Sequence, residues 1–294
     1  MSTADSPDFF QLDKTGVRAA FDRASQTYEA AAVLQSRVAD ELLSRLEPFD
    51  FQPQLILDLG AGTGRATAEL KRRYRRARVI ALDLAPGMLQ QAARHQHLFR
   101  RFERVCADAS RLPLQSACAD IIFSNLMLQW CDPLEVFTEV RRVLKPQGFF
   151  AFTTLGPDTL KELRSAWAEA DTHNHVNRFL DAHDVGDALM RAGLQEPVLD
   201  IDRTQLTYTD GMSLMRDLKC IGARNATAGR PRSLLGRSHL QRVLTAYEAY
   251  RKDGRLPATY EVIYGAAWGS AGKPAASPQD GEVRISPSAI RRRK

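Results

Sequence analysis

The chain has few cysteines, and their spacing excludes the commonest structural uses of this residue. None lies in a C-x-x-C pair, and no secretory signal segment is recognisable; the cysteines are Cys106, Cys118, Cys131 and Cys220. Isolated cysteines in a chain without such a signal are typical of reduced thiols. We therefore expect a cytoplasmic protein without disulfides.

Long apolar runs are missing as well. No segment approaches the roughly 20 consecutive apolar residues that cross a bilayer, although 44% of the residues are hydrophobic. A chain of 294 residues can nevertheless bury a sizeable core in one large domain. The sequence thus predicts a soluble protein with no membrane partner.

Recognisable catalytic and metal-binding sets are also absent. No Ser-His-Asp or Cys-His arrangement stands out. The pairs His95–His97 and His173–His175 have a spacing of two, which brings both side chains to one side only in a strand. Both pairs fall at helix ends or in loops without a cysteine or acidic partner, so we expect no metal.

The excess of positive charge is modest. Lys and Arg number 41 against 35 Asp and Glu, a net charge of +6, and part of it lies in residues 71–76 and 291–294. Such a balance permits an acidic protein or a nucleic acid as partner and establishes neither. Residues 1–16 read as a flexible N-terminus and residues 269–294, rich in Ser, Pro, Gly and Arg, as a disordered basic tail.

A glycine-rich loop follows the first apolar strand. Three glycines spaced two apart, Gly60, Gly62 and Gly64, come directly after Asp58. The spacing departs from G-x-G-x-x-G, and no Lys-Ser/Thr follows, which favours a ligand with an ammonium group and no phosphate. S-adenosylmethionine is such a ligand: Asp58 would hold its ammonium, and the next helix N-terminus its carboxylate. Taken alone, the loop also fits a tight strand-to-helix turn.

Two further acidic residues end the next two strands. Asp83 lies 25 residues beyond Asp58, where a carboxylate can bond both hydroxyls of a ribose. Leu84 and Met88 follow it and would lie against adenine. Asp108 and Ala109 end the third strand, where carboxylate and backbone can bond the adenine amino group and ring; acidic groups at three successive strand ends are hard to explain as solvated loop charges.

Strands and helices alternate from residue 55 to residue 154, which predicts an α/β fold with a doubly wound, Rossmann-like parallel sheet. The expected strands are 55–58, 79–82, 102–107, 121–124 and 148–154. Residues 17–47 have helical periodicity and would form a lid over the cofactor. Helices within 210–250 would lie on the acceptor side, and one domain would span residues 17–268.

These residues resemble the class I S-adenosylmethionine-dependent methyltransferases, with Asn125 after the fourth strand, where such enzymes meet methyl donor and acceptor. More specific segments are similar to the malonyl-acyl-carrier-protein O-methyltransferase family of biotin synthesis. They are residues 21–24 with Tyr28, Asn125–Leu126 with Gln129–Trp130, 151–155, 177–180 and 215–223. The resemblance covers roughly residues 17 to 268, and Cys220 departs from it, since glycine is expected there.

The resemblance implies methyl transfer from S-adenosylmethionine to the free carboxylate of a malonyl thioester on acyl carrier protein or coenzyme A. A malonyl carboxylate is already ionised at neutral pH, so no acid or base residue is required. Tyr28, Asn125 and Gln129 would position the reactants, while Trp130 is expected in the core. Arg178 beside Phe179 would offer the carboxylate a planar fork.

A carrier protein presents an acidic helix, so its enzyme should carry a basic patch near the pocket mouth. Arg216 and Lys219 lie three apart on one predicted helix. The further docking candidates are Arg224, Arg230, Arg232 and Arg237. A solvated basic face is the alternative interpretation.

Other functions fit parts of the pattern. A methyltransferase acting on another small molecule would share everything up to Asn125. A non-catalytic or hydroxylase-type assembly factor on the same fold would leave malonyl thioesters untouched. A nucleic-acid methyltransferase is disfavoured, because no Asn-Pro-Pro-Tyr or Asp-Pro-Pro-Tyr motif for an extruded base is present.

Overall fold

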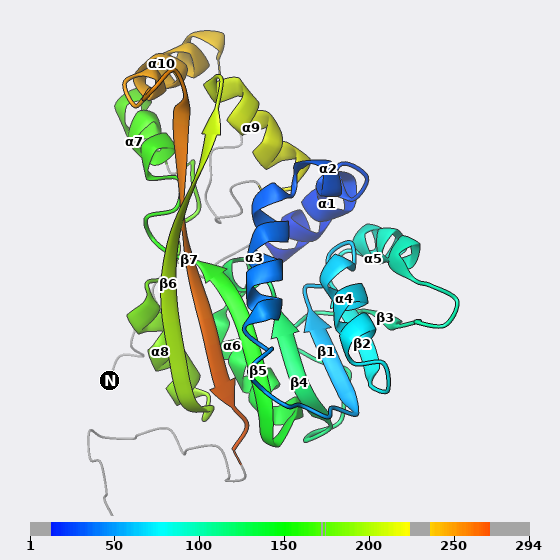
Figure 1. The fold of residues 1–294 in the computed structure, drawn as a ribbon. Coiled ribbons are helices and arrows are strands. Elements are labelled where there is room, and N and C mark those ends of the chain that lie inside the picture. The colour runs from blue at the N-terminus through cyan, green and yellow to red at the C-terminus, as the bar shows by residue number, and fades with distance from the viewer. Residues whose placement is uncertain (1–12, 172, 174, 224–235, 271–294) are drawn as a thin grey trace, which may run out of the picture.

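The computed structural model describes residues 13–171, 173, 175–223 and 236–270. These residues form one seven-stranded mixed sheet in the order β3-β2-β1-β4-β5-β7-β6 (Figure 1). The strands are β1 (Leu55–Leu59), β2 (Arg78–Asp83), β3 (Glu103–Cys106), β4 (Ala119–Ser124), β5 (Leu144–Leu155), β6 (Gln195–Tyr208) and β7 (Leu256–Trp268).

The predicted doubly wound α/β sheet is confirmed, with an antiparallel addition. Strands β1 to β5 pair in parallel. Strand β7 lies antiparallel between β5 and β6. Because the first three strands run the same way, their carboxyl ends meet at one edge of the sheet.

Helices cover both faces of the sheet and extend beyond one end of it. They are α1 (Lys14–Ala24), α2 (Tyr28–Ala31), α3 (Val33–Ser44), α4 (Arg65–Arg73), α5 (Pro86–Ala92), α6 (Pro133–Val143), α7 (Lys161–Ala170), α8 (Ala182–Arg191), α9 (Gly211–Cys220) and α10 (Arg237–Glu248). Helices α3, α4 and α5 pack in one hydrophobic cluster, and α6 and α8 in a second on the opposite face. Helices α7 and α9 lie beside the part of β6 and β7 that extends beyond the other strands, and α10 lies near the tip of that part (Figure 1).

The N-terminal helical region is broken into three helices. Helix α1 begins at Lys14, earlier than expected, because the side chain of Asp13 accepts a hydrogen bond of 2.8 Å from the amide of Gly16. The chain then turns twice before α3. Among the described residues, no helix is both long and apolar enough to cross a lipid bilayer.

Candidate active site

The glycine loop crosses from β1 toward the end of β2 and is held there by Asp83. The amide of Gly62 donates to Oδ2 of Asp83 at 2.8 Å, and the amide of Ala85 donates to Oδ1 at 2.8 Å. Gly60 has a φ of +69°, and a Cβ there would lie 2.4 Å from Cγ of Met127. Only glycine fits this position, because the backbone is left-handed and closely packed.

The cavity at the carboxyl ends of β1 to β4, here the strand-end cavity, has a volume of about 670 Å³, open solvent included. It is lined by every predicted cofactor residue except Asp58 and Gly64. Those lining residues are Gly60, Gly62, Asp83, Leu84, Met88, Asp108, Ala109 and Asn125. Asp58 lines a neighbouring cavity that shares Tyr28, Gly60, Gly62 and Asn125 with it.

Gly64 serves the packing of two helices. It precedes α4 with a φ of +81°, and a Cβ there would lie 2.6 Å from Cβ of Ala92, at the end of α5. The third glycine of the loop thus lets α4 approach α5 closely. The structure gives it no place on the wall of the strand-end cavity.

Asp58 is a buried carboxyl group without an observed cationic partner among the described residues. It is 1% exposed, and its Oδ2 accepts a hydrogen bond of 2.5 Å from the hydroxyl of Thr67. Burial raises the pKa of Asp58 to about 7, with Thr67 acting in the opposite direction. A cation at this place would favour the ionised form, which fits the ammonium group of S-adenosylmethionine.

The raised pKa of Asp58 predicts that acid weakens binding of a ligand with an α-ammonium group, such as S-adenosylhomocysteine. Below pH 7 the free protein carries a proton on Asp58 that must leave when the ammonium binds. The Kd should therefore rise up to about tenfold per pH unit below 7, measured by calorimetry.

Two variants test that pH dependence. Asp58→Asn should bind weakly with no such dependence. His95→Gln should retain it, although His95 lines the same cavity and pairs with Glu29 at 2.6 Å. A Kd independent of pH in the unmodified protein would contradict the assignment of Asp58.

Asp108 is already engaged by the protein. Its Oδ1 accepts from the amide and hydroxyl of Ser110, both at 2.9 Å, and its Oδ2 accepts from Nζ of Lys14 at 3.0 Å. Burial alone would raise the pKa of Asp108, but the bonds from Ser110 and Lys14 outweigh it and hold the pKa below its usual value. An adenine amino group at Oδ2 would share this oxygen with Lys14.

The N-terminal helices close over the strand-end cavity through several polar contacts. Asp22 of α1 accepts from the amide of Gly87 at 2.7 Å. The side chain of Asn125 donates to the carbonyl of Gln35 at 3.1 Å and accepts from Thr153 at 2.9 Å. Asn125 thus links α3, β4 and β5, and it borders the cavity while both ends of its amide are engaged.

A second, mainly apolar cavity adjoins the first. This apolar chamber has a volume of about 760 Å³ and lies among α1, α3, α7, α9 and β7. The residues that line both cavities are Phe21, Tyr28, Leu126 and Trp130. Trp130 is therefore a wall residue of both cavities, and its interpretation as a core side chain is wrong; its ring packs edge to face with that of Phe21, with 5.3 Å between ring centroids.

Polar groups in the apolar chamber are few and mostly uncharged. Its described lining contains no Asp, Glu, Lys or Arg. Gln129 donates to the carbonyl of Leu126 at 2.6 Å, while its Oε1 is buried without a hydrogen-bond donor. Leu126 has a φ of +49°, an uncommon conformation for a residue with a side chain. The sequence does not indicate this backbone conformation. It also did not predict that Leu126 lies where the two cavities meet.

Arg178 does not line the apolar chamber. In the segment after α7, Asn177 is buried and lines the chamber, whereas Arg178 is exposed. Arg178 instead lines an outer cavity, and Phe179 lines both. The expectation that Arg178 anchors the malonyl carboxylate in the chamber therefore has to be revised.

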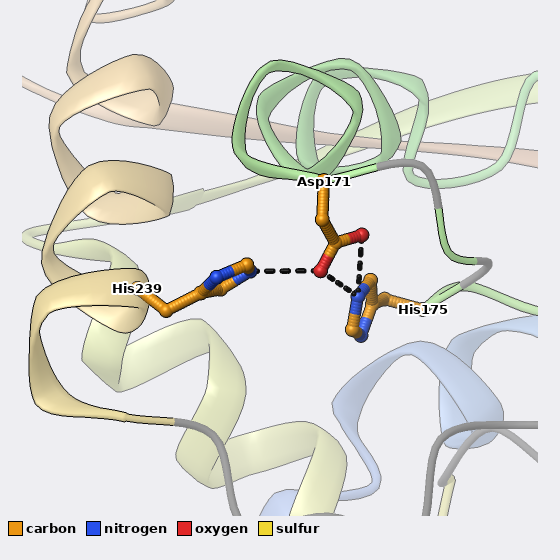
Figure 2. A group of neighbouring side chains, drawn as sticks. All are labelled: Asp171, His175 and His239. Atoms are coloured by element: carbon orange, nitrogen blue, oxygen red, sulfur yellow. Dashed lines mark hydrogen bonds and ion pairs between the residues drawn. The ribbon is translucent and has the colours of Figure 1, made fainter.

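The histidine pair at 173–175 does acquire an acidic partner, contrary to expectation. Asp171 accepts from Nε2 of His175 at 2.8 and 3.0 Å, and Nε2 of His239, from α10, lies 2.8 Å from Asp171 (Figure 2). The three ligand atoms lie within 4.8 Å of one another, close enough for a metal ion. However, Arg242 lies 3.1 Å from Nδ1 of His239 and can only donate a hydrogen bond to it. A neutral His239 therefore carries its proton on Nε2, which is the atom that a metal ion at this place would need.

Known proteins are similar to this chain in sequence and in fold. Residues 57–152 match a family model described as a methyltransferase domain. The chain is 53% identical over 268 residues to malonyl-[acyl-carrier protein] O-methyltransferase of Methylovorus sp., covering 89% of this chain and 90% of that protein. It is 50% identical over 290 residues to the protein of that name from Halorhodospira halophila, covering 98% of each.

Solved structures agree on the fold. A putative methyltransferase from Bacillus halodurans matches with a TM-score of 0.57 and 18% identity, over 79% of this chain and 99% of that one. Identity at this level shows the architecture alone. The sequence relatives are far closer, and the chain belongs to the malonyl-[acyl-carrier protein] O-methyltransferase family of class I S-adenosylmethionine-dependent methyltransferases.

Proposed function

We propose that this enzyme transfers a methyl group from S-adenosylmethionine to the free carboxylate of a malonyl group carried by acyl carrier protein, the entry step to the pimeloyl part of biotin. The observation that carries the proposal is the contact between the strand-end cavity and the apolar chamber. Four side chains, among them Tyr28 and Leu126, line both. A donor bound in one cavity can therefore face an acceptor bound in the other.

The residues of the strand-end cavity fit the methyl donor. Asp58 offers a buried carboxyl group to the ammonium, and Asp83 retains acceptor lone pairs for the ribose hydroxyls. Met88, 1% exposed, and Leu84 supply an apolar wall for adenine. When bound, S-adenosylmethionine supplies an electrophilic methyl group on a positively charged sulfur.

The apolar chamber suits a carboxylate that is already ionised. Its walls exclude water, which strengthens the nucleophile, and no general base is needed. Burial and the charge of Asp83 raise the pKa of Tyr28, so its hydroxyl stays protonated and donates. A hydrogen bond from Tyr28 orients the carboxylate without neutralising it, whereas a tightly bound cation would oppose a step in which charge is lost.

Gln129 gives the chamber a place for an amide. Its buried Oε1 lacks a donor among the described residues, and an unsatisfied buried acceptor costs about 1–3 kcal/mol. The pantetheine arm of a carrier protein contains amide N–H groups. One of them would satisfy Oε1 and hold the thioester end of the arm.

The docking surface for the carrier protein is proposed on α9 and α10. Arg216 and Lys219 are exposed on the same side of α9, and Arg237 is exposed at the start of α10. Leu218 and Ile221 of the same region line the apolar chamber, so a protein bound there would lie next to it. The other candidates, Arg224, Arg230 and Arg232, lie outside the described residues. We place the enzyme in the cytoplasm, consistent with its described cysteines being free thiols.

Purified enzyme should transfer labelled methyl from S-adenosylmethionine to malonyl carrier protein and form a base-labile ester. Acetyl carrier protein is the matched control, since it lacks the free carboxylate and should accept no label. Failure to label the malonyl form, under conditions where calorimetry detects cofactor binding, would refute the proposed reaction.

A further inference from the structure

An outer cavity lies against the apolar chamber, between α7 and the segment that follows it. Three residues, His175, Val176 and Phe179, line both spaces. The two spaces therefore adjoin at these side chains.

Two guanidinium groups line the outer cavity. Arg164 of α7 donates to the carbonyl of Thr159 at 2.6 Å, while its Nε is buried without a hydrogen-bond partner among the described residues. Arg178, in the segment that follows α7, lines the same cavity. Burial first, and then the charge of Arg178, lower the pKa of Arg164. Two like charges held together in this way favour a bound anion.

The nearby carboxylates are shared with other cations. Asp171 lines the cavity but accepts from Nε2 of His175 and from the amide of His173, and it lies 2.8 Å from His239 (Figure 2). Asp158, whose charge also acts on Arg164, lies 3.5 Å from Lys161 and 3.4 Å from Arg203. Both carboxylates thus also contact cations other than these two guanidinium groups.

We propose that the outer cavity binds the phosphate of the pantetheine arm that carries the malonyl group, with Arg164 and Arg178 as the phosphate ligands. This inference rests on the proposed function and names the route by which its substrate enters. Guanidinium groups match phosphate oxygens in geometry and charge. The arm passes His175, Val176 and Phe179, presents its amides to Gln129 and places the malonyl group beside Tyr28.

Binding of fragments of the arm tests the site without turnover. Calorimetry should show that the enzyme binds 4′-phosphopantetheine at least tenfold more tightly than pantetheine, which lacks the phosphate, and that inorganic phosphate competes. Arg178→Gln should remove most of this difference. Arg191→Gln, an exposed arginine of α8, should preserve it. Equal binding of the two fragments by the unmodified enzyme would overturn the proposal.

Steady-state kinetics with acceptors that carry or lack the phosphate test whether the site recognises the phosphate of the substrate. In Arg178→Gln and Arg164→Gln, kcat/KM for malonyl carrier protein should fall roughly 10–100-fold, mainly through KM, as expected for lost charge-assisted hydrogen bonds. For the malonyl thioester of N-acetylcysteamine, which lacks the phosphate, kcat/KM should fall by no more than about threefold. Cofactor affinity should be unchanged. Equal losses on both acceptors would show a structural role instead.

If the two variants lost kcat/KM only with malonyl-coenzyme A, the site would bind nucleotide phosphates. That result would overturn the assignment to the carrier arm. Thermal unfolding of each variant identifies a folding defect. Such a defect is expected more in Arg164→Gln than in Arg178→Gln, because Arg164→Gln breaks the hydrogen bond to the carbonyl of Thr159. Arg178→Gln, at an exposed position, remains the decisive variant. An unmodified enzyme that prefers 4′-phosphopantetheine but methylates no malonyl thioester would refute the proposed function while leaving the phosphate site in place.

Discussion

Replacing Asp83 by asparagine should weaken binding of S-adenosylhomocysteine roughly 100-fold. The two carboxylate oxygens accept the amides of Gly62 and Ala85 at 2.8 Å each, so they shape the glycine loop as well as offering lone pairs to the ribose. Asparagine has one acceptor oxygen, and its NH₂ group would face an N–H donor. Losing about two charge-assisted contacts costs about 3 kcal/mol, close to two orders of magnitude in Kd, measured by calorimetry.

The matched control for Asp83→Asn is Asp40→Asn. Asp40 pairs with Arg65 at 2.9 Å on the outside of the N-terminal helices, so its replacement should leave the Kd within about threefold of that of the unmodified enzyme. If Asp83→Asn folds normally and also stays within threefold, the ribose does not bind at the end of β2.

Replacing Tyr28 by phenylalanine should lower kcat roughly 10–100-fold and leave cofactor affinity nearly unchanged. Tyr28 lines the strand-end cavity and the apolar chamber, and burial together with the charge of Asp83 keeps its hydroxyl protonated. The hydroxyl then aims the malonyl carboxylate at the methyl group. Its loss removes one charge-assisted hydrogen bond, worth about 1.5–3 kcal/mol, as steady-state kinetics with malonyl carrier protein would measure.

Tyr250→Phe is the control for the tyrosine hydroxyl, since Tyr250 follows α10 and lines neither cavity; it should turn over normally. The pH profile separates positioning from proton transfer. Tyr28→Phe should reduce the rate without changing the profile's shape, because no proton leaves the substrate. A normal kcat in Tyr28→Phe would remove Tyr28 from the reaction.

The strand-end cavity could be predicted from sequence because its position follows from local rules. An apolar strand followed by an acidic residue defines a strand end, and parallel strands bring their ends to one edge. Asp83 and Asp108 needed no more than this to be placed together. Gly64 was assigned to the cofactor for the same reason, and the contact with Ala92 that explains it arises only when α4 and α5 pack.

Contacts between segments far apart in the chain could not be predicted in this way. The sequence around Asp108 does not indicate its contact with Lys14. The sequence around His175 does not indicate that His239 lies beside the same carboxylate, Asp171. That Arg178 borders the outer cavity and not the apolar chamber depends on how the segment after α7 packs. The length of strand β6 could not be predicted, because most of its side chains are exposed and its apolar residues do not alternate regularly.

The most direct test of the account is a crystal structure of the enzyme with S-adenosylhomocysteine and a malonyl thioester of phosphopantetheine. We expect the cofactor's sulfur between the glycine loop and Tyr28, with the malonyl carboxylate in the apolar chamber and its oxygen facing the sulfur. A malonyl group bound elsewhere, or a chamber closed by protein side chains while the cofactor is bound, would contradict it.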